Sequence, residues 1–278
     1  MKWNVMTYKS VLPRLLGVCV LLTAVSAFAQ SAKTEVLWLG QSAFRITTPG
    51  GKVIITDPWL TPNPLTPPQY KKLENLGKID VLLVTHAHGD HIADAPAIAK
   101  LNNIRLWGAG DLNMALTTLG VLPPAQLPRF GIGGRVVPAP GIKVTATQAN
   151  HSSVFVWKNP ATGKDETHPT GEPVGFIIEL ENGFKIWHMG DTGVFGDMKW
   201  ISEYYKPDLV LIPIGGHFTM DPIDADYALR ELIKPRFAIP MHYGANPLGV
   251  GTPEQLITAL GSTSTKILAL KPGEKAEF

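Results

Sequence analysis

Short hydrophobic runs alternate with polar turns along most of the chain. Early in the sequence, three such runs are separated by Gly-Gln-Ser and Pro-Gly-Gly turns, a pattern typical of an antiparallel meander. A continuous apolar run at Asp80–Val84 then indicates a buried strand, and helical spacing follows at Ile92–Leu101. Asp111 is the expected cap of the next helix, Leu112–Leu119. The pattern predicts strands at Thr34–Leu39, Ala43–Thr47, Lys52–Thr56, Asp80–Val84, Ile104–Trp107 and Ile142–Gln148, and helices at Ile92–Leu101 and Leu112–Leu119.

The second half of the chain repeats this arrangement. Each half runs from paired strands to alternating strands and helices, so we expect an α/β fold in which two sheets pack face to face with helices outside. A hairpin is expected across the Glu-Asn-Gly turn at residues 181–183. The predicted elements are strands at Val174–Leu180, Phe184–Met189, Leu209–Ile214, Phe237–Pro240 and Lys266–Leu270, and helices at Ile223–Ile233 and Pro253–Leu260.

Two long segments, Trp59–Lys72 and His151–Pro173, show no regular pattern and are rich in proline or glycine. Long irregular loops in a compact domain are usually functional. They carry several aromatic residues, which suggests an apolar or ring-bearing ligand, although aromatic side chains in loops can equally serve packing. These residues are Trp59, Tyr70, Phe155 and Trp157.

The composition of the 278 residues is that of an ordinary globular protein, with 45% hydrophobic and 17% charged residues. The formal net charge is +2, and no run of basic residues occurs. A nucleic-acid partner is therefore not expected. A small molecule is the expected partner.

The N-terminus has the three parts of a secretory signal peptide. Basic residues at Lys2, Lys9 and Arg14 precede an apolar stretch, and Ala-Phe-Ala at residues 27–29 is a small-residue cleavage site. The apolar stretch is shorter than the roughly 20 residues of a spanning helix, which disfavours the alternative of an uncleaved anchor. We predict a signal peptide over residues 1–29 and a single mature domain over 30–278, periplasmic or secreted and without stable membrane anchoring.

Cys19 is the only cysteine, and it lies within the predicted signal peptide. Cleavage after Ala29 removes this thiol and also three positive charges, which changes the formal charge from +2 to −1. The mature chain then has neither a disulfide nor a cysteine metal ligand. Metal binding would depend on histidine and carboxylate side chains.

A cluster of metal-ligand residues directly follows the apolar run at Asp80–Val84, in the sequence Thr-His-Ala-His-Gly-Asp-His. His86 and His88 are two residues apart and can face the same side of an extended chain, whereas Asp90 and His91 open the following helix. A solvated loop with incidental histidines is the alternative. The dense clustering of ligand-type side chains favours a metal site.

Three further ligand-type residues follow other predicted strands. His151 lies in Ala-Asn-His-Ser-Ser, Asp191 in Met-Gly-Asp-Thr-Gly, and His242 in Pro-Met-His-Tyr-Gly. Each of them could be a turn residue on its own. Together with the cluster, they provide enough ligands for two metal ions.

These motifs, in this order, resemble those of the metallo-β-lactamase superfamily over almost all of the predicted mature chain. Thr56–Leu60 and the block Gly190–Tyr243 are similar to one branch, a group of metal-dependent hydrolases related to L-ascorbate-6-phosphate lactonases. The resemblance implies an αββα sandwich of two mixed sheets, with a metal site at the edge between them. It also implies that His86, His88 and His151 bind one ion, that Asp90, His91 and His242 bind the other, and that Asp191 bridges both.

The implied activity is hydrolysis of an ester, lactone or phosphodiester-type bond by a hydroxide held between the two ions. Such nitrogen and oxygen ligands suit Zn²⁺ best, and also Mn²⁺, Fe²⁺ or Ni²⁺. Two relatives of the same fold are alternatives: a β-lactamase, disfavoured because Asp191 matches lactonases, and a mononuclear iron oxidoreductase. A non-enzymatic metal-binding protein is a weaker alternative, because every ligand position is filled.

Roles are also expected for individual polar residues in and near these motifs. We expect Asp90 and His217 to be catalytic, with His217 as a donor that faces the substrate; a structural role is the alternative for His217. His168 is expected to be an exposed loop residue and His188 a core residue that could support the site. Asp57 either orients a ligand histidine or belongs to a turn.

Overall fold

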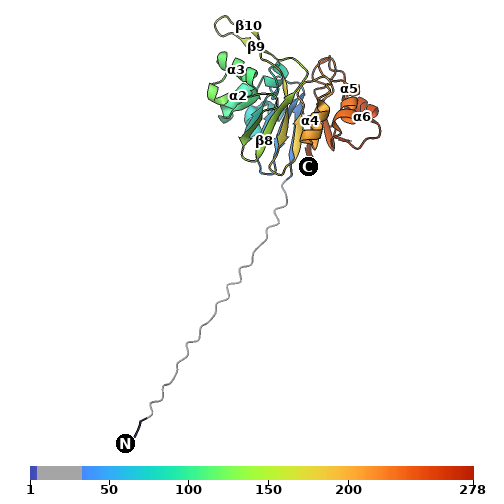
Figure 1. The fold of residues 1–278 in the computed structure, drawn as a ribbon. Coiled ribbons are helices and arrows are strands. Elements are labelled where there is room, and N and C mark those ends of the chain that lie inside the picture. Colours follow the sequence, from blue (N-terminus) through green and yellow to red (C-terminus); the bar gives the residue numbers. More distant parts are fainter. Residues whose placement is uncertain (5–32) are drawn as a thin grey trace. The chain divides into compact units, whose positions relative to one another are not determined.

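Two seven-stranded mixed sheets form the centre of the fold (Figure 1). The structure, a computed structural model, describes residues 1–4 and 33–278. The predicted signal peptide at residues 1–29 lies outside the described residues apart from its first four, and its cleavage stays a prediction. In the described part of the chain, no helix combines the length and the apolar character needed to cross a membrane.

The first sheet is antiparallel on one side and parallel on the other. Its three central antiparallel strands are the predicted meander, and its parallel strands begin where β3 pairs with β4. In spatial order it contains β16 (Lys275–Glu277), β1 (Glu35–Gly40), β2 (Ala43–Thr47), β3 (Val53–Thr56), β4 (Val81–Leu83), β5 (Leu106–Ala109) and β6 (Arg129–Phe130).

The second sheet has the same mixed character. The predicted hairpin is present as an antiparallel pair, and the three strands beyond it are parallel. Its spatial order is β15 (Lys266–Ile267), β14 (Phe237–Met241), β13 (Leu209–Pro213), β12 (Lys185–His188), β11 (Val174–Glu179), β8 (Ile142–Gln148) and β7 (Arg135–Ala139).

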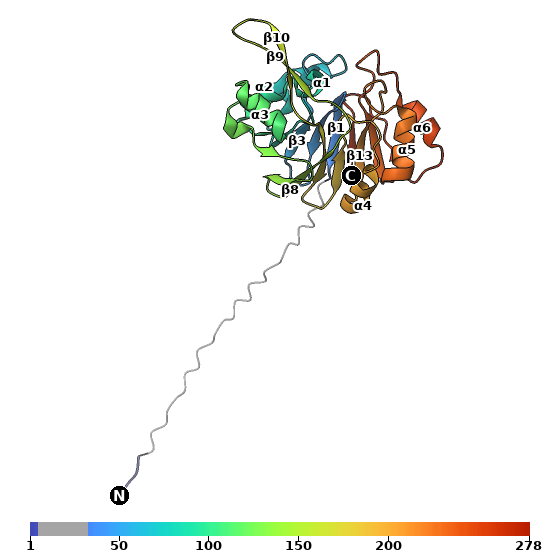
Figure 2. The ribbon, with the colours of Figure 1, turned by 45° about the horizontal axis from the view of Figure 1, so that its top comes forward.

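The longer helices lie outside the sheets, with α2 and α3 on one side and α4, α5 and α6 on the other (Figures 1 and 2). The predicted αββα arrangement of two mixed sheets is therefore confirmed. The helices are α1 (Gly89–Ile92), α2 (Ala95–Asn102), α3 (Gly110–Thr118), α4 (Met198–Tyr205), α5 (Pro222–Tyr227), α6 (Pro253–Leu260), the 3₁₀-helices η1 (Pro68–Lys71), η2 (Leu73–Leu76) and η3 (Pro124–Gln126), and the π-helix η4 (Ala228–Ile233).

Two hydrophobic clusters hold these layers together. One includes inward-facing residues of both sheets, such as Phe44 of β2 and Phe176 of β11, both fully buried. The other joins the second sheet to its outer helices through residues such as Trp187, Met198 and Leu256. Burial of this apolar area is the main driving force for the fold, and it makes the strand ends a rigid support for the site.

The helix predicted at Ile92–Leu101 is interrupted, and its sequence contributes to both α1 and α2. The break falls at Asp94, whose carboxylate accepts hydrogen bonds from the backbone N–H groups of Leu60 and Thr61 at 2.7 and 2.9 Å. A long-range contact therefore ends the first helix. In the second half, the predicted helix Ile223–Ile233 is likewise divided, into α5 and the π-helix η4.

Asp111 was expected to cap the next helix, and this is wrong. Strand β5 runs directly into α3 without a loop, so Ala109 occupies the cap position and Asp111 lies within the first turn. A carboxylate there still favours the positive end of the helix dipole.

The segment His151–Pro173, predicted to be irregular, contains the antiparallel hairpin β9 (Val154–Lys158) and β10 (Asp165–Pro169), which projects away from the sheets in both views (Figures 1 and 2). The polar sequence Asp-Glu-Thr-His-Pro lacks a strand pattern, which explains the error. The predicted strand Lys266–Leu270 is also shorter than expected, because only β15 pairs with β14.

Candidate metal centre

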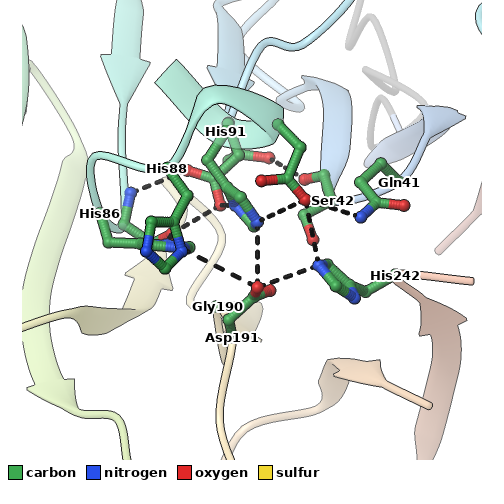
Figure 3. A network of polar contacts seen from close by, with 12 residues as sticks. Gln41, Ser42, His86, His88, His91, Gly190, Asp191 and His242 are labelled. Atoms are coloured by element: carbon green, nitrogen blue, oxygen red, sulfur yellow. Dashed lines mark hydrogen bonds and ion pairs between the residues drawn. The ribbon is translucent and has the colours of Figure 1, made fainter. Parts of the chain in front are cut away.

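The predicted metal ligands meet at one edge of the two sheets. His86 and His88 follow strand β4, and His91 lies on α1; Asp191 and His242 follow strands β12 and β14 of the other sheet. Figure 3 shows these side chains pointing toward one another. The site therefore forms because the ends of strands from both sheets meet there.

The first group of side chains consists of His86, His88 and His151. His88 Nδ1 lies 3.0 Å from His86 Nε2 and 3.3 Å from His151 Nε2. Around a tetrahedral zinc ion with bonds of about 2.0–2.1 Å, ligand atoms lie about 3.3 Å apart. The spacing of these three nitrogens fits such an ion.

The second group consists of Asp90, His91, Asp191 and His242. His242 Nε2 lies 2.9 Å from Asp191 Oδ2 and 3.4 Å from Asp90 Oδ2. His91 Nε2 lies 3.2 and 3.7 Å from the same two oxygens. Two carboxylates and two imidazoles thus face one point.

Asp191 borders both groups. Its Oδ2 atom is also 3.9 Å from His86 Nε2 and 3.7 Å from His151 Nε2 in the first group. The side chain is almost completely buried, so this oxygen is held between the two sets of imidazoles. This position is the one that a bridging ligand requires.

Several buried polar atoms at the centre lack a hydrogen-bond partner among the residues that the structure describes. They are His91 Nε2, His242 Nε2 and Asp191 Oδ1. A buried polar atom without a partner is unfavourable by about 1–3 kcal/mol. Since these three belong to the candidate ligands, cations coordinated there would satisfy the group, and the residues present fit a metal centre.

Asp57 orients the candidate ligand histidines. This is one of the two roles expected for Asp57 from the sequence, the other being a turn residue. Its carboxylate accepts a hydrogen bond from His91 Nδ1 at 2.8 Å and from the hydroxyl and backbone N–H of Thr85, both at 2.7 Å. The Thr85 oxygen in turn lies 3.0 Å from His86 Nδ1 and can accept its proton. With Nδ1 protonated in both rings, Nε2 is left free to bind a cation.

His188 combines the two roles that the sequence left open. It is fully buried and donates from Nε2 to the backbone oxygen of Ser42 at 3.0 Å. Its Nδ1 accepts a hydrogen bond from the backbone N–H of Gly190 at 3.2 Å. This core histidine therefore holds the turn that presents Asp191.

Burial lowers the pKa of each imidazole in the first group, most strongly for His86. In the second group, burial also lowers the pKa of His242, but the charge of Asp191 outweighs it and raises the pKa to about 9. Burial raises the pKa of the Asp191 carboxyl, yet the charges of His242 and His91 hold it well below its usual range. Cations bound by this group would therefore displace protons from its imidazoles.

A cavity of about 530 Å³ opens onto both groups. It is lined by five of the seven candidate ligands, together with Gln41, Trp59, Ser152, Phe218 and Asn246. Of the aromatic residues proposed to face a ligand, Trp59 thus lies at the cavity. Tyr70 packs against the hydrophobic core, and Trp157 lies on the projecting hairpin.

Gln41 is a functional candidate that sequence reasoning missed. Its amide donates to Asp90 Oδ2 at 2.9 Å, and its backbone oxygen accepts from the N–H of His242 at 3.1 Å. Gln41 belongs to the Gly-Gln-Ser turn and has a φ of 52°, a conformation that non-glycine residues rarely adopt. One signal for this role was available in the sequence, which is a polar residue in the turn between β1 and β2.

His217 and His168 do not line this cavity. His217 faces a neighbouring cavity, and the adjacent Phe218 faces the metal groups instead. The geometry therefore gives no support to His217 as a donor at the metal groups. His168 lies on β10, partly exposed, with its ring 6.0 Å from that of Trp157.

The fold and site agree with the comparison to known proteins. A family model described as the Beta-lactamase superfamily domain matches residues 52–243, which include all seven candidate ligands. The chain belongs to the metallo-β-lactamase superfamily. The finer relation to ascorbate-6-phosphate lactonases stays a prediction.

Relatives with high sequence identity are metal-dependent hydrolases. A UPF0173 metal-dependent hydrolase from a Polaromonas species is 68% identical over 254 residues, covering 91% of this chain and 93% of that protein. One from Cupriavidus necator is 61% identical over 251 residues, covering 89% and 87%. Igni18, a metallo hydrolase from Ignicoccus hospitalis, superposes with a TM-score of 0.74 at 33% identity, covering 88% and 98%. This superfamily member is therefore a metal-dependent hydrolase.

Proposed function

We propose that this hydrolase holds two divalent metal ions and cleaves ester, lactone or phosphodiester-type bonds. The observation that carries the proposal is the position of Asp191 Oδ2, within 3.9 Å of imidazoles from both groups. His86, His88 and His151 would hold one ion, and Asp90, His91 and His242 the other, with Asp191 shared. Zn²⁺ suits these ligands best, and Mn²⁺, Fe²⁺ and Ni²⁺ are also compatible.

When bound, the ions supply Lewis acidity, which makes a coordinated water more acidic and polarises the electrophilic centre. The chain contributes charge and orientation. The ionised carboxylate of Asp191 offsets the charge of the cations, and the Asp57–Thr85 pair fixes the tautomers of His86 and His91. These groups are largely in place before substrate arrives, so little reorganisation is needed during the reaction.

Hydrolysis requires a new bond from a water oxygen to the carbonyl carbon or phosphorus, and loss of the bond to the leaving oxygen, which receives a proton. Asp90 lines the cavity, and its side chain is 32% exposed. Burial raises the pKa of its carboxyl, but the neighbouring imidazoles of His91 and His242 together outweigh this and hold the pKa below the ordinary value. Asp90 is thus an ionised acceptor that can orient the attacking water, in keeping with its expected catalytic role.

We also propose that the enzyme is exported and acts in the periplasm or outside the cell. The support for this is the signal-peptide pattern in residues 1–29 and the absence of cysteine from the remaining sequence. The intact mass of the protein in the periplasmic fraction should be that of a chain that begins at Gln30. A product that retains Met1 in the membrane fraction would contradict export.

The test of the dinuclear hydrolase is metal analysis combined with a substrate panel. The mature protein should contain close to two divalent ions per chain and should hydrolyse at least one of a lactone, a thioester, a p-nitrophenyl ester or bis-p-nitrophenyl phosphate. The same protein treated with a chelator is the control and should be inactive. At most one ion after full reconstitution would contradict the proposal, as would turnover of a cephalosporin alone, which would favour a β-lactamase. A single iron with oxidation of a sulfur compound would favour the oxidoreductase.

A further inference from the structure

A second cavity, of about 610 Å³, lies beside the metal cavity. It is lined by apolar residues, among them Pro222, Ile223 and Val250, and by polar residues of α6, among them Gln255 and Thr258. None of the proposed metal ligands lines this cavity, so its role is separate from holding the ions.

Two loops form walls of both cavities. In the loop that follows β13, Phe218 lines the metal cavity and His217 lines the second cavity. In the loop that follows His242, Asn246 lines the metal cavity and Val250 the second one. The N–H of Gly251 donates to the backbone oxygen of Gly215 at 3.1 Å, which ties the two loops together. The two cavities therefore share these loops as part of their walls.

Large apolar side chains are exposed on these loops and on the neighbouring helix. The exposed fractions are 46% for Phe218, 65% for Ile223, 50% for Leu248 and 75% for Val250. Leaving several apolar side chains in water at one place is unfavourable, and such patches beside a concave site commonly mark where a ligand binds. The position of these exposed side chains beside the second cavity favours an apolar group as its ligand.

The charges of the second cavity disfavour an anionic group. Neither lysine nor arginine is among the described residues that line the two cavities. The carboxylates present are those of Asp90 and Asp191 in the metal cavity and Asp221 and Glu254 in the second. In the second cavity, an anionic substituent such as a phosphate monoester would find neither lysine nor arginine and would be repelled by the carboxylates of Asp221 and Glu254.

We propose that the second cavity binds an uncharged alkyl or aryl group of the substrate whose scissile bond lies at the metal groups. The substrate is then one that carries an apolar alkyl or aryl group next to its hydrolysable bond, such as an alkyl ester or an alkyl-substituted lactone. This inference rests on the proposed hydrolytic function. It also gives His217 a place beside the apolar group of the substrate, away from the scissile bond.

The test is a series of p-nitrophenyl esters from acetate to octanoate, assayed with the metal-loaded mature protein. Burial of each methylene contributes about 0.8 kcal/mol, so kcat/KM should rise about threefold to fourfold per methylene until the cavity is filled. Val250→Asp should reduce the ratio of kcat/KM for octanoate over acetate by about tenfold, because a charge then borders the alkyl chain. Ile223→Asp, at the exposed first turn of α5, should have the same effect and provides a second variant if the first fails to fold.

The matched control is Val137→Asp on β7, because Val137 is 62% exposed and lies outside both cavities. It should leave the octanoate-to-acetate ratio unchanged. If the wild-type rates do not depend on chain length, or if the control lowers the ratio as much as Val250→Asp, the apolar subsite is wrong while the hydrolase proposal stands. If no ester, lactone or phosphodiester is cleaved by protein that holds its metals, the proposed function itself fails.

Discussion

At the scale of single residues, Asp191 is the candidate ligand whose substitution should affect both metal groups. Its Oδ2 atom faces four imidazoles from both groups, and its side chain is almost completely buried. No other carboxylate among the described residues faces both groups. The spacing and charge balance of two cations would therefore depend on this one side chain.

We expect Asp191→Asn to keep the shape of the side chain but to remove its charge. The cations would repel each other with less compensation, so at least one should bind more weakly. Hydrolysis should fall by a factor on the order of 10² or more, because changes in groups that merely support ligands already cost 10–100-fold. Elemental analysis and kcat/KM measure both effects. His217→Ala is the control and should keep both metals; near-normal rates in Asp191→Asn would refute the bridge.

Gln41 offers a prediction about a residue that supports a ligand. Gln41→Met removes the amide that donates to Asp90 and keeps a similar volume. Affinity for the metal in the second group should fall about 10–100-fold, as for other residues that orient metal ligands. Competition with a coloured chelator measures this affinity, with Gln69→Met on the exposed surface of η1 as the control. Equal affinity in both variants would show that Asp90 is held without Gln41.

At the scale of elements, the features that sequence predicts well are those set by neighbouring residues. The strands β2 and β13 are defined by local apolar patterns, and the ligand motifs lie at strand ends, where strands from both sheets bring them together. The break at Asp94 and the position of Gln41 beside Asp90 depend on contacts across 34 and 49 residues, which no local pattern records. Such contacts appear only once the sheets are assembled.

The break between α1 and α2 gives a prediction about stability. Asp94→Ala should lower the free energy of unfolding by about 2–3 kcal/mol, because the buried N–H group of Leu60 and the partly buried N–H group of Thr61 would lose a charged acceptor. Thr61→Ala removes only the hydroxyl bond at 2.7 Å and should cost about 1 kcal/mol. Urea unfolding of both metal-free variants gives the comparison. A change below about 0.5 kcal/mol in Asp94→Ala would mean that the loop is fixed by other contacts.

At the scale of the whole molecule, the two sheets are connected at separate places. At the turns, Glu181 of the second sheet accepts hydrogen bonds from Thr48 and Lys52 of the first, both at 2.9 Å. At the strand ends that carry the metal groups, each group takes ligands from both sheets, as His86 and His151 show for the first. Bound ions would therefore link the sheets across their interface.

Removal of the metals should destabilise the whole unit and not only stop hydrolysis. A ligand present at about 1,000 times its Kd stabilises the folded state by about 4 kcal/mol, and a protein of this size changes its Tm by about 2–4 °C per kcal/mol. Treatment with a chelator should thus lower the Tm by about 8–16 °C, as measured by calorimetry, and added Zn²⁺ should restore it. Asp191→Asn is the matched control: its Tm should respond less to the chelator, because it holds the ions more weakly from the start. Identical melting of the metal-loaded and metal-free proteins would mean that the two sheets are held together by their apolar interface alone.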